Sequence, residues 1–295
     1  MSILVDKKTK VIVQGLTGTQ ASFHIQRAIK YGTNIVAGVV PNKKESSHLG
    51  IPLFSTVKEA KKKTSANASL IFVPANFAKN AILEAIEAEI ETVVIITSGI
   101  PVSDMLIVRE ALENSKTLLI GPNTPGIMTP KQAYLGIFPD DIQNSGNIGI
   151  ISRSSTLTSE AIHEINSIGM GESTIIGLGD DFVIGSGFNK LIEKFNEDKK
   201  TKAIVLLGGL RGNYELEASK FYKNLKKKKP IIALIVEDAA SLSTEDGLAS
   251  EVICSGITSV SEKKEFLRES GIIVVDSTSQ LKEELLKLWI NGYPY

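Results

Sequence analysis

Apolar and polar positions follow two alternating patterns along the chain. Short runs of β-branched and other apolar residues are separated by longer stretches in which apolar residues recur every three or four positions. The first pattern is typical of strands buried on both faces, and the second of helices with one apolar face. In the first half these patterns predict strands at residues 10–14, 34–40, 69–73, 92–97 and 117–120, and helices that include residues 76–90 and 103–115.

The same alternation resumes after residues 138–147, a segment rich in turn formers that we interpret as a linker. Further strands are expected at residues 148–152, 174–178, 203–207, 231–236 and 271–275. Strands that alternate with helices favour parallel sheets with right-handed crossovers, so the fold class is predicted to be α/β. Two domains are expected, at residues 1–142 and 143–295.

Length and composition fit a globular protein of two domains. The 295 residues are 42% hydrophobic and 22% charged, and the 33 basic residues balance the 33 acidic ones. No overall field attracts nucleic acid or an anionic membrane, so neither is expected as a partner. The one cysteine, Cys254, cannot form a disulfide within the chain and suits a reducing compartment. Without a spanning apolar run or a secretory signal, we expect a cytoplasmic protein, or a matrix protein if a mitochondrial targeting segment has been removed.

A glycine-containing turn directly follows the first predicted strand. Residues 14–21 read Gln-Gly-Leu-Thr-Gly-Thr-Gln-Ala and open a predicted helix that runs to Tyr31. A strand, a glycine turn and a helix start bring free backbone N–H groups to one place, where they can bind phosphate. The spacing is G-x-x-G-x-x-A rather than the dinucleotide fingerprint G-x-G-x-x-G. Taken alone, the turn is explained equally well by a tight strand-to-helix connection.

Six segments, in order, resemble the α subunit of succinyl-CoA synthetase, and the resemblance runs over nearly the whole chain. They read KVIVQGLTGTQASFH, AGVVPNKKESSHLGIPLF, IFVPANFAKNAILEAI, ITSGIP, GPNTPGI and ISRSSTLTSEA. This resemblance implies an N-terminal Rossmann-like domain that binds CoA and a C-terminal flavodoxin-like domain of ligase type, both with mainly parallel sheets. It also implies a β-type partner subunit of ATP-grasp fold, in a heterodimer or heterotetramer, which supplies the nucleotide and Mg²⁺.

The resemblance assigns the cofactor-binding residues of the first domain. Most of them follow predicted strands, which is where open parallel sheets bind ligands. One of them, Lys43, matches a lysine that glycines flank in the family, and those glycines have become Asn42, Lys44 and Glu45 here. The residues expected to bind CoA are Thr17, Gly18, Thr19, Gln20, Lys43, Val73, Pro74, Thr97, Ser98 and Asn123.

The residue that should carry the phosphoryl group is missing. In the family, a histidine within Gly-His-Ala-Gly is phosphorylated by nucleotide and passes the group to a carboxylate, and CoA then attacks the acyl phosphate. Here the matching position is Leu248, and Gly209 replaces the glutamate that orients the histidine. Ser155 replaces a glycine at the phosphate-binding helix start. The phosphohistidine step is therefore predicted to be lost, leaving no intact catalytic residue and no metal site in this chain. An anion can still be expected at Ser152, Arg153, Ser154, Ser155 and Thr156.

Several other polar residues have structural interpretations. His24 and His48 match family positions but are expected to be structural, and His163 lies on a predicted helix away from the missing histidine. Asp180 and Asp181 are interpreted as a helix N-cap or a solvated turn, and Cys254 as a small core residue.

Three hypotheses about function follow. The first is a CoA-binding α-type subunit of an acid–CoA ligase complex. The second is a non-catalytic regulatory or scaffolding pseudoenzyme that binds CoA and an ATP-grasp β-type partner. The third is a different acyl-transfer chemistry on the same scaffold, for which the sequence offers no base or nucleophile. A small carboxylic acid is the expected substrate of an active complex; succinate is the family's usual acid, and malate and citrate remain open.

Overall fold

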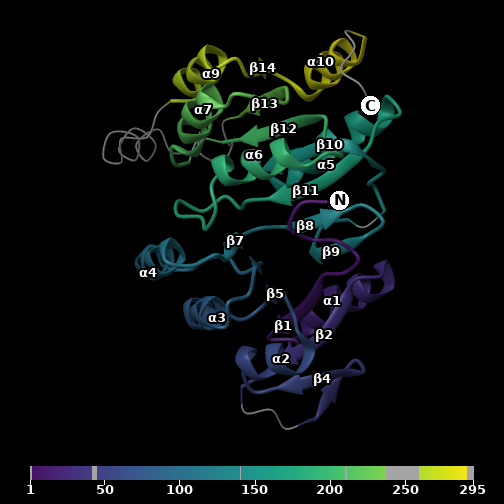
Figure 1. The fold of residues 1–295 in the computed structure, drawn as a ribbon, viewed down its shortest axis with the longest axis vertical. Coiled ribbons are helices and arrows are strands. Elements are labelled where there is room, and N and C mark those ends of the chain that lie inside the picture. The colour runs from purple at the N-terminus through teal and green to yellow at the C-terminus, as the bar shows by residue number, and fades with distance from the viewer. Residues whose placement is uncertain (1, 42–44, 140, 210, 237–258, 291–295) are drawn as a thin grey trace. The chain divides into compact units, whose positions relative to one another are not determined.

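A computed structural model describes residues 2–41, 45–139, 141–209, 211–236 and 259–290 (Figure 1). Contacts divide the chain into two compact units. The N-terminal unit contains Ser2–Asp141 and, from the second half of the sequence, Ile176–Ser186. The C-terminal unit contains Ile142–Ile175 and the residues from Gly187 onward. The domain bounds expected from the sequence, 1–142 and 143–295, stay a prediction.

The N-terminal unit contains a seven-stranded sheet with the order β3-β4-β2-β1-β5-β6-β7. The pairs of β2 with β4 and β1, and the pairs from β1 through β5 and β6 to β7, are parallel, whereas β3 and β4 form an antiparallel pair. The strands span Lys10–Gln14 (β1), Asn34–Val39 (β2), Ser47–His48 (β3), Ile51–Phe54 (β4), Ala68–Ile71 (β5), Thr92–Ile95 (β6) and Leu118–Ile120 (β7). The predicted α/β class is confirmed, and each expected strand of the first half is present.

Helices with one apolar face cover this sheet. Ala78, Ala81, Ile82 and Ala85 line the buried face of α3, and their spacing of three and four residues matches the helical period. They pack in the core with strand residues such as Ile12 and Val93, which are fully buried. The four helices of the seven-stranded part span Thr19–Tyr31 (α1), Val57–Thr64 (α2), Ala75–Glu87 (α3) and Val102–Glu113 (α4).

An antiparallel hairpin completes the N-terminal half. Its strands are β8 (Gly126–Thr129) and β9 (Ala133–Gly136). The hydroxyl of Thr33, which follows α1, donates to the carbonyl of Tyr134 and accepts from its N–H, at 3.0 and 2.9 Å. Tyr134 is completely buried, and its own hydroxyl donates to the carbonyl of Phe138 at 3.0 Å. These bonds satisfy the buried polar groups and fix the hairpin against the end of α1.

Five strands of the second series lie in the order β14-β13-β12-β10-β11. Neighbours from β10 through β12 and β13 to β14 are parallel. The strands span Ser145–Ser152 (β10), Glu172–Gly177 (β11), Ala203–Gly208 (β12), Ile231–Ile235 (β13) and Ile273–Val275 (β14). The helices span Ser155–Ser167 (α5), Phe188–Glu197 (α6), Tyr214–Asn224 (α7), Val260–Glu269 (α9) and Thr278–Ile290 (α10).

Strand β10 begins earlier than its apolar run predicts. Ser145, Gly146 and Asn147 fall within the predicted linker, yet they form the first three residues of the strand. Ser145 is exposed and the next two residues are only partly buried, so turn-forming residues are tolerated there. Residues from 148 onward, which carry the apolar pattern, enter the core.

Candidate functional site

The predicted cofactor segments gather at the carboxyl edge of the first sheet. The glycine turn follows β1, Val73 and Pro74 come just after β5, Thr97 and Ser98 come just after β6, and Asn123 comes just after β7. Because these strands are parallel and adjacent, all four segments meet at one edge of the sheet. Lys43, predicted to join them after β2, lies outside the described residues.

Helix α1 begins within the glycine turn without a side-chain cap. Its N-cap is Gly18, which has no side chain to accept from the first N–H groups of the helix. Those groups have no partner in the helix, so they are available for an anion. Thr17, Gly18, Thr19 and Gln20 are all exposed, which places side chains with hydroxyl and amide groups around the same spot.

Close packing at Gly15 sets the shape of this turn. Gly15 has a φ of +81°, a left-handed conformation that favours glycine, and a Cβ there would lie 3.2 Å from Cγ1 of Val73. Its N–H donates to the carbonyl of Val39 at 3.0 Å. The turn after β1 is therefore packed directly against the segment after β5.

Hydrogen bonds continue this series across the edge. The hydroxyl of Thr97 donates to the carbonyl of Val73 at 2.5 Å, and the N–H of Asn123 donates to the carbonyl of Thr97 at 2.9 Å. Each predicted segment is thus held by the next one along the sheet. The structure brings together nine of the ten predicted cofactor residues, and the tenth is Lys43.

Asn123 has an unusual backbone and a bonded side chain. It follows a cis Gly121–Pro122 peptide and has a φ of 56°, in the left-handed region. Its side-chain Nδ2 donates to Oδ1 of Asp181 at 3.0 Å. Asp180 and Asp181 do not cap a helix, since α6 has Gly187 as its N-cap, and both are half-buried in a bend. The N-cap interpretation of these aspartates is therefore wrong.

The two histidines of the N-terminal unit make local packing contacts. His24 on α1 stacks on Phe72 with ring centroids 6.1 Å apart and meets the edge of Phe23 at 5.1 Å. Burial, and then the charge of Arg27, hold the pKa of His24 below its usual value. Nε2 of His48 lies 2.8 Å from the hydroxyl of Ser22, which donates to the carbonyl of Leu16 at 3.1 Å. His48 thereby ties β3 to the glycine turn.

The anion site predicted in the C-terminal unit lies at the start of α5. Ser154 is the N-cap, and its hydroxyl oxygen accepts from the N–H of Leu157 at 3.3 Å. The hydroxyl of Ser152 donates to the carbonyl of Ser154 at 2.8 Å, while Ser155 and Thr156 are exposed. The N–H groups of Ser155 and Thr156 lie in the first turn of α5, where no carbonyl of the helix can accept from them. The hydroxyl oxygen of Ser154 accepts from Leu157 instead, so these two N–H groups are the best donors for an anion.

Arg153 differs from its neighbours because its guanidinium is engaged inside the unit. Only 3% of the residue is exposed, its N–H donates to the carbonyl of Leu207, and its Nη1 donates to the carbonyl of Arg211. The guanidinium also stacks over the ring of Tyr214, 5.2 Å from the centroid. This residue holds the loop after β12, which also contains Gly209.

A buried ion pair lies beneath that loop. Glu215 on α7 accepts from the N–H of Gly209 with Oε1 at 3.1 Å, and its Oε2 is 2.9 Å from Nζ of Lys263 on α9. Sequence reasoning missed both residues. The sequence did contain a signal for them, because each is a charged residue at a helix position where the helical period requires an apolar side chain. Leu248 and Cys254 lie outside the described residues.

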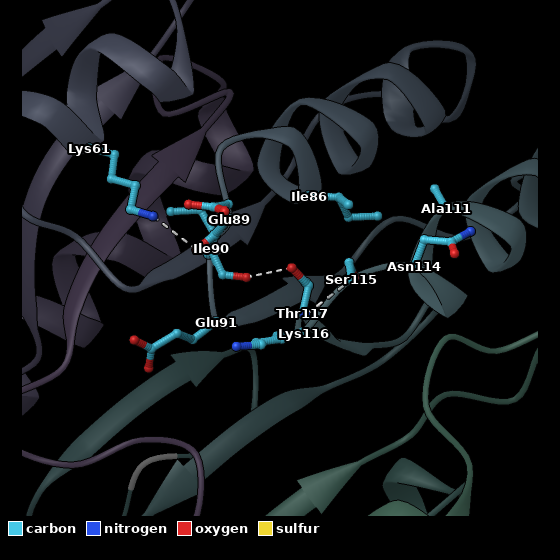
Figure 2. A pocket seen from close by; sticks show the side chains of 10 residues that line it. All are labelled: Lys61, Ile86, Glu89, Ile90, Glu91, Ala111, Asn114, Ser115, Lys116 and Thr117. Atoms are coloured by element: carbon cyan, nitrogen blue, oxygen red, sulfur yellow. Dashed lines mark hydrogen bonds between the residues drawn. The ribbon is translucent and has the colours of Figure 1, made fainter.

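A cavity of about 500 Å³ opens at the opposite, amino edge of the first sheet (Figure 2). It is formed by the ends of α3 and α4 and the starts of β6 and β7, and no predicted site residue lines it. The ammonium of Lys61 donates to the carbonyls of Ala88 and Glu89 at 2.8 and 2.9 Å, and the hydroxyl of Thr117 donates to that of Ile90 at 2.7 Å. These three bonds close the end of α3.

Two negative findings apply to the described part of the chain. It contains no group of three or more His, Cys, Asp or Glu side chains that could hold a metal ion. Among its helices, none combines the length and the apolar character needed to cross a membrane.

Two family models match the sequence in the order of the two units. A CoA binding domain matches residues 6–99 and a CoA-ligase domain matches residues 151–285. The first range contains three of the four segments at the carboxyl edge of the first sheet, and the second begins at the end of β10, just before α5. Fold and matches together define a chain of the CoA-binding and CoA-ligase class.

Similarity to particular proteins extends over nearly the full length. The chain is 42% identical to the α subunit of the ADP-forming succinate–CoA ligase of Staphylococcus epidermidis, over 97% of this chain and 94% of the relative. It is 44% identical to the corresponding subunit of Aquifex aeolicus, over 98% and 95% of the two chains. The chain therefore belongs to the family of succinate–CoA ligase α subunits.

Solved structures confirm the fold. ATP citrate lyase from Methanothrix soehngenii, in complex with citrate and coenzyme A, aligns with a TM-score of 0.85 at 22% identity. The alignment covers 99% of this chain and 52% of the lyase chain. A dinucleotide-forming acetyl-coenzyme A synthetase from Korarchaeum cryptofilum aligns with a TM-score of 0.69 at 21% identity, over 92% of this chain and 58% of that one. This chain thus spans about half of each of these larger chains.

Proposed function

We propose that this chain is the CoA-binding α-type subunit of an acid–CoA ligase complex in which the phosphohistidine step has been lost from this chain. The observation that carries the first part is the gathering of Thr17–Gln20, Val73, Thr97 and Asn123 at one sheet edge, in a chain matched by a CoA binding domain. Relatives of this chain at 41–44% identity are α subunits of succinate–CoA ligases.

In this proposal the start of α1 binds the phosphates of CoA. Uncapped N–H groups and the helix dipole favour an anion there, and the exposed hydroxyls of Thr17 and Thr19 add donors. Lys43 provides a positive charge from the loop after β2. Val73, Pro74, Thr97, Ser98 and Asn123 flank the rest of the cofactor, which runs along the carboxyl edge.

The partner in this proposal is a β-type subunit of ATP-grasp fold. Nucleotide and Mg²⁺ bind to that subunit. The acid is a small carboxylic acid of the succinate, malate or citrate type. The start of α5, with Ser155 and Thr156 exposed, supplies donors for an anionic group of the substrate.

Loss of the phosphohistidine step rests on three positions, Leu248, Gly209 and Ser155. Leu248 has no atom that can accept a phosphoryl group, and Gly209 has no carboxylate to orient a histidine. The carboxylate of Glu215, which accepts from the N–H of Gly209, is fully buried and paired with Lys263. It is therefore committed to holding the loop. A complex with this chain would have to transfer the phosphoryl group without a histidine of the α-type subunit, or would act without turnover.

Two measurements test the proposal. Calorimetric titration with CoA should show one site per chain, and the absence of binding would overturn the CoA assignment. The protein, purified together with its native partner, is then incubated with γ-³²P-labelled ATP. We expect no acid-labile phosphate on this chain in the wild type. Labelling should appear in Leu248→His/Gly209→Glu, and phosphate on the wild-type chain would show that another residue carries it.

A further inference from the structure

We propose that Asp181 is a positioning residue for Asn123, so that a segment from the second half of the sequence fixes a ligand-facing side chain of the N-terminal unit. The inference rests on the proposed function, because Asn123 is expected to face CoA. The two residues are 58 positions apart in the sequence, and both belong to the N-terminal unit.

The hydrogen bond orients the amide of Asn123. An exposed asparagine can turn its amide so that either the oxygen or the nitrogen faces a ligand. Here Nδ2 donates to Oδ1 of Asp181 at 3.0 Å, and a carboxylate cannot donate in return. The amide oxygen must therefore point away from Asp181. Asn123 consequently presents an acceptor, suited to an amide N–H, a hydroxyl or the thiol of the CoA arm.

The backbone of Asn123 is held at the same time. Its N–H donates to the carbonyl of Thr97, and its φ of 56° is one that asparagine adopts more readily than most residues. The main chain of Asn123 is thus bonded to Thr97 and its side chain to Asp181. Together these two bonds fix the direction of the side-chain amide.

Asp181 is itself delivered from a firmly attached segment. The carbonyl of Gly177 accepts from the hydroxyl of Thr124 at 2.5 Å, and the N–H of Gly185 donates to the carbonyl of Gly121 at 2.9 Å. Between these two bonds, Gly179 packs so closely that a Cβ would lie 1.9 Å from the carbonyl oxygen of Pro122. Residues on both sides of Asp181 are thus bonded to the 121–124 turn that carries its partner.

Three variants distinguish a positioning role of Asp181 from an effect of its negative charge. Asp181→Ala removes the acceptor, whereas Asp181→Asn keeps an oxygen that can accept from Asn123 but loses the charge. Asn123→Gly removes the amide and tolerates the positive φ. A double-mutant cycle in CoA affinity then tests whether position 181 acts through position 123.

The experiment is calorimetric titration of CoA into the full chain and its variants, with thermal melting of each. We expect Asp181→Ala to raise Kd about tenfold, Asp181→Asn to raise it less than about threefold, and Asp181→Ala to change Kd less than about twofold in an Asn123→Gly background. Independent, additive effects would overturn the inference, and so would Asp181→Asn as damaging as Asp181→Ala.

The outcomes also distinguish this inference from the proposed function. CoA binding by the wild type with an unchanged Kd in Asp181→Ala would overturn the positioning role alone. No CoA binding by the wild type would overturn the proposed function and the positioning role together. If Asp181→Ala does not fold, Asp181→Asn and Asp181→Leu, each with and without Asn123→Gly, provide the same cycle.

Discussion

The ammonium of Lys263 lies 2.9 Å from Oε2 of Glu215, and both side chains are completely excluded from solvent. The same ammonium donates to the carbonyls of Gly209 and Gly212 at 2.8 and 2.7 Å. Burial holds the pKa of Lys263 below its usual value, and the charge of Glu215 opposes that shift. Lys263 therefore holds the loop after β12 in place, and it supplies a partner for two carbonyls of that loop.

Breaking this pair should be costly. We expect Lys263→Met to lower the free energy of unfolding of the C-terminal unit by about 3–5 kcal/mol, because it leaves a buried carboxylate and two carbonyls unpaired. Urea unfolding followed by fluorescence of the single tryptophan, Trp289 on α10, measures this. Lys263→Met/Glu215→Leu should recover part of the loss.

Lys264→Met is the matched control. Lys264 is the next residue on α9 and pairs with Asp276 at 2.7 Å, but the side chain of Asp276 is 62% exposed. Solvent screens such a pair, so its removal should cost only a small fraction of the loss at Lys263. Equal losses for the two variants would show that burial of the Lys263 pair has no special effect.

Glu172 should make the stability of the same unit depend on pH. This residue at the start of β11 is fully buried, its Oε1 has no partner within the described residues, and burial raises its pKa from 4.5 to about 8. Between these values the folded protein keeps a proton that the unfolded chain releases, so stability falls as pH rises from 4.5 to 8. The slope is about 1.4 kcal/mol per pH unit at most.

The measurement is urea unfolding at intervals from pH 5 to pH 8.5. Glu172→Gln should flatten the decline and be more stable than the wild type at the upper end. Glu193→Gln, on the exposed side of α6, is the control and should follow the wild-type profile. A parallel decline in Glu172→Gln would assign the pH dependence to other groups.

Close packing at Gly179 can be separated from its backbone conformation. Gly179 and Gly271 both have a φ of +88°, but a Cβ at Gly271 would meet nothing within 4 Å. Gly271→Ala should therefore cost only the left-handed penalty of about 1–2 kcal/mol. Gly179→Ala should cost about 1–3 kcal/mol more, because its Cβ would overlap the carbonyl of Pro122. Calorimetric melting compares the two, and similar losses would contradict the packing argument.

Thr97 should affect ligand binding more than stability. Thr97→Val removes the bond to the carbonyl of Val73 without changing side-chain shape, and we expect about a fivefold loss of CoA affinity for about 1 kcal/mol of stability. Thr64→Val removes a comparable bond, from a hydroxyl to the carbonyl of Ala60 at 2.8 Å, at the end of α2. It should cost similar stability and leave CoA affinity unchanged. Titration and melting of both variants test this.

The strands were the most predictable part of the fold. Runs such as residues 92–95 and 203–207 are buried on both faces, so nearly every position is apolar and the pattern is plain. Strands β3 and β4 were not predicted, because two to four residues that include Pro52 and a half-exposed histidine carry no such pattern. Local sequence thus missed these short pairings, and it also missed the hairpin strands β8 and β9, although every residue in them is buried.

The candidate site was predictable where it follows strand ends. The turn after β1 and the segments after β5, β6 and β7 meet because parallel strands direct their carboxyl ends to one edge. The bond between Asn123 and Asp181 could not be foreseen, since it depends on packing between segments 58 residues apart. Glu215 and Lys263 were missed because charged residues are usually exposed, and only the three-dimensional pairing shows why these are buried.

The placement of Ile176–Ser186 in the N-terminal unit has a consequence for how this chain can be divided. A fragment that ends at residue 142 contains the whole seven-stranded sheet but lacks the partners of Leu119, Gly121, Asn123 and Thr124. If two relatives exchanged halves at residue 142, the 119–124 turn of one protein would have to pack against the 177–186 segment of the other. Substitutions in the 119–124 and 177–186 segments should therefore be inherited together, as one unit of recombination.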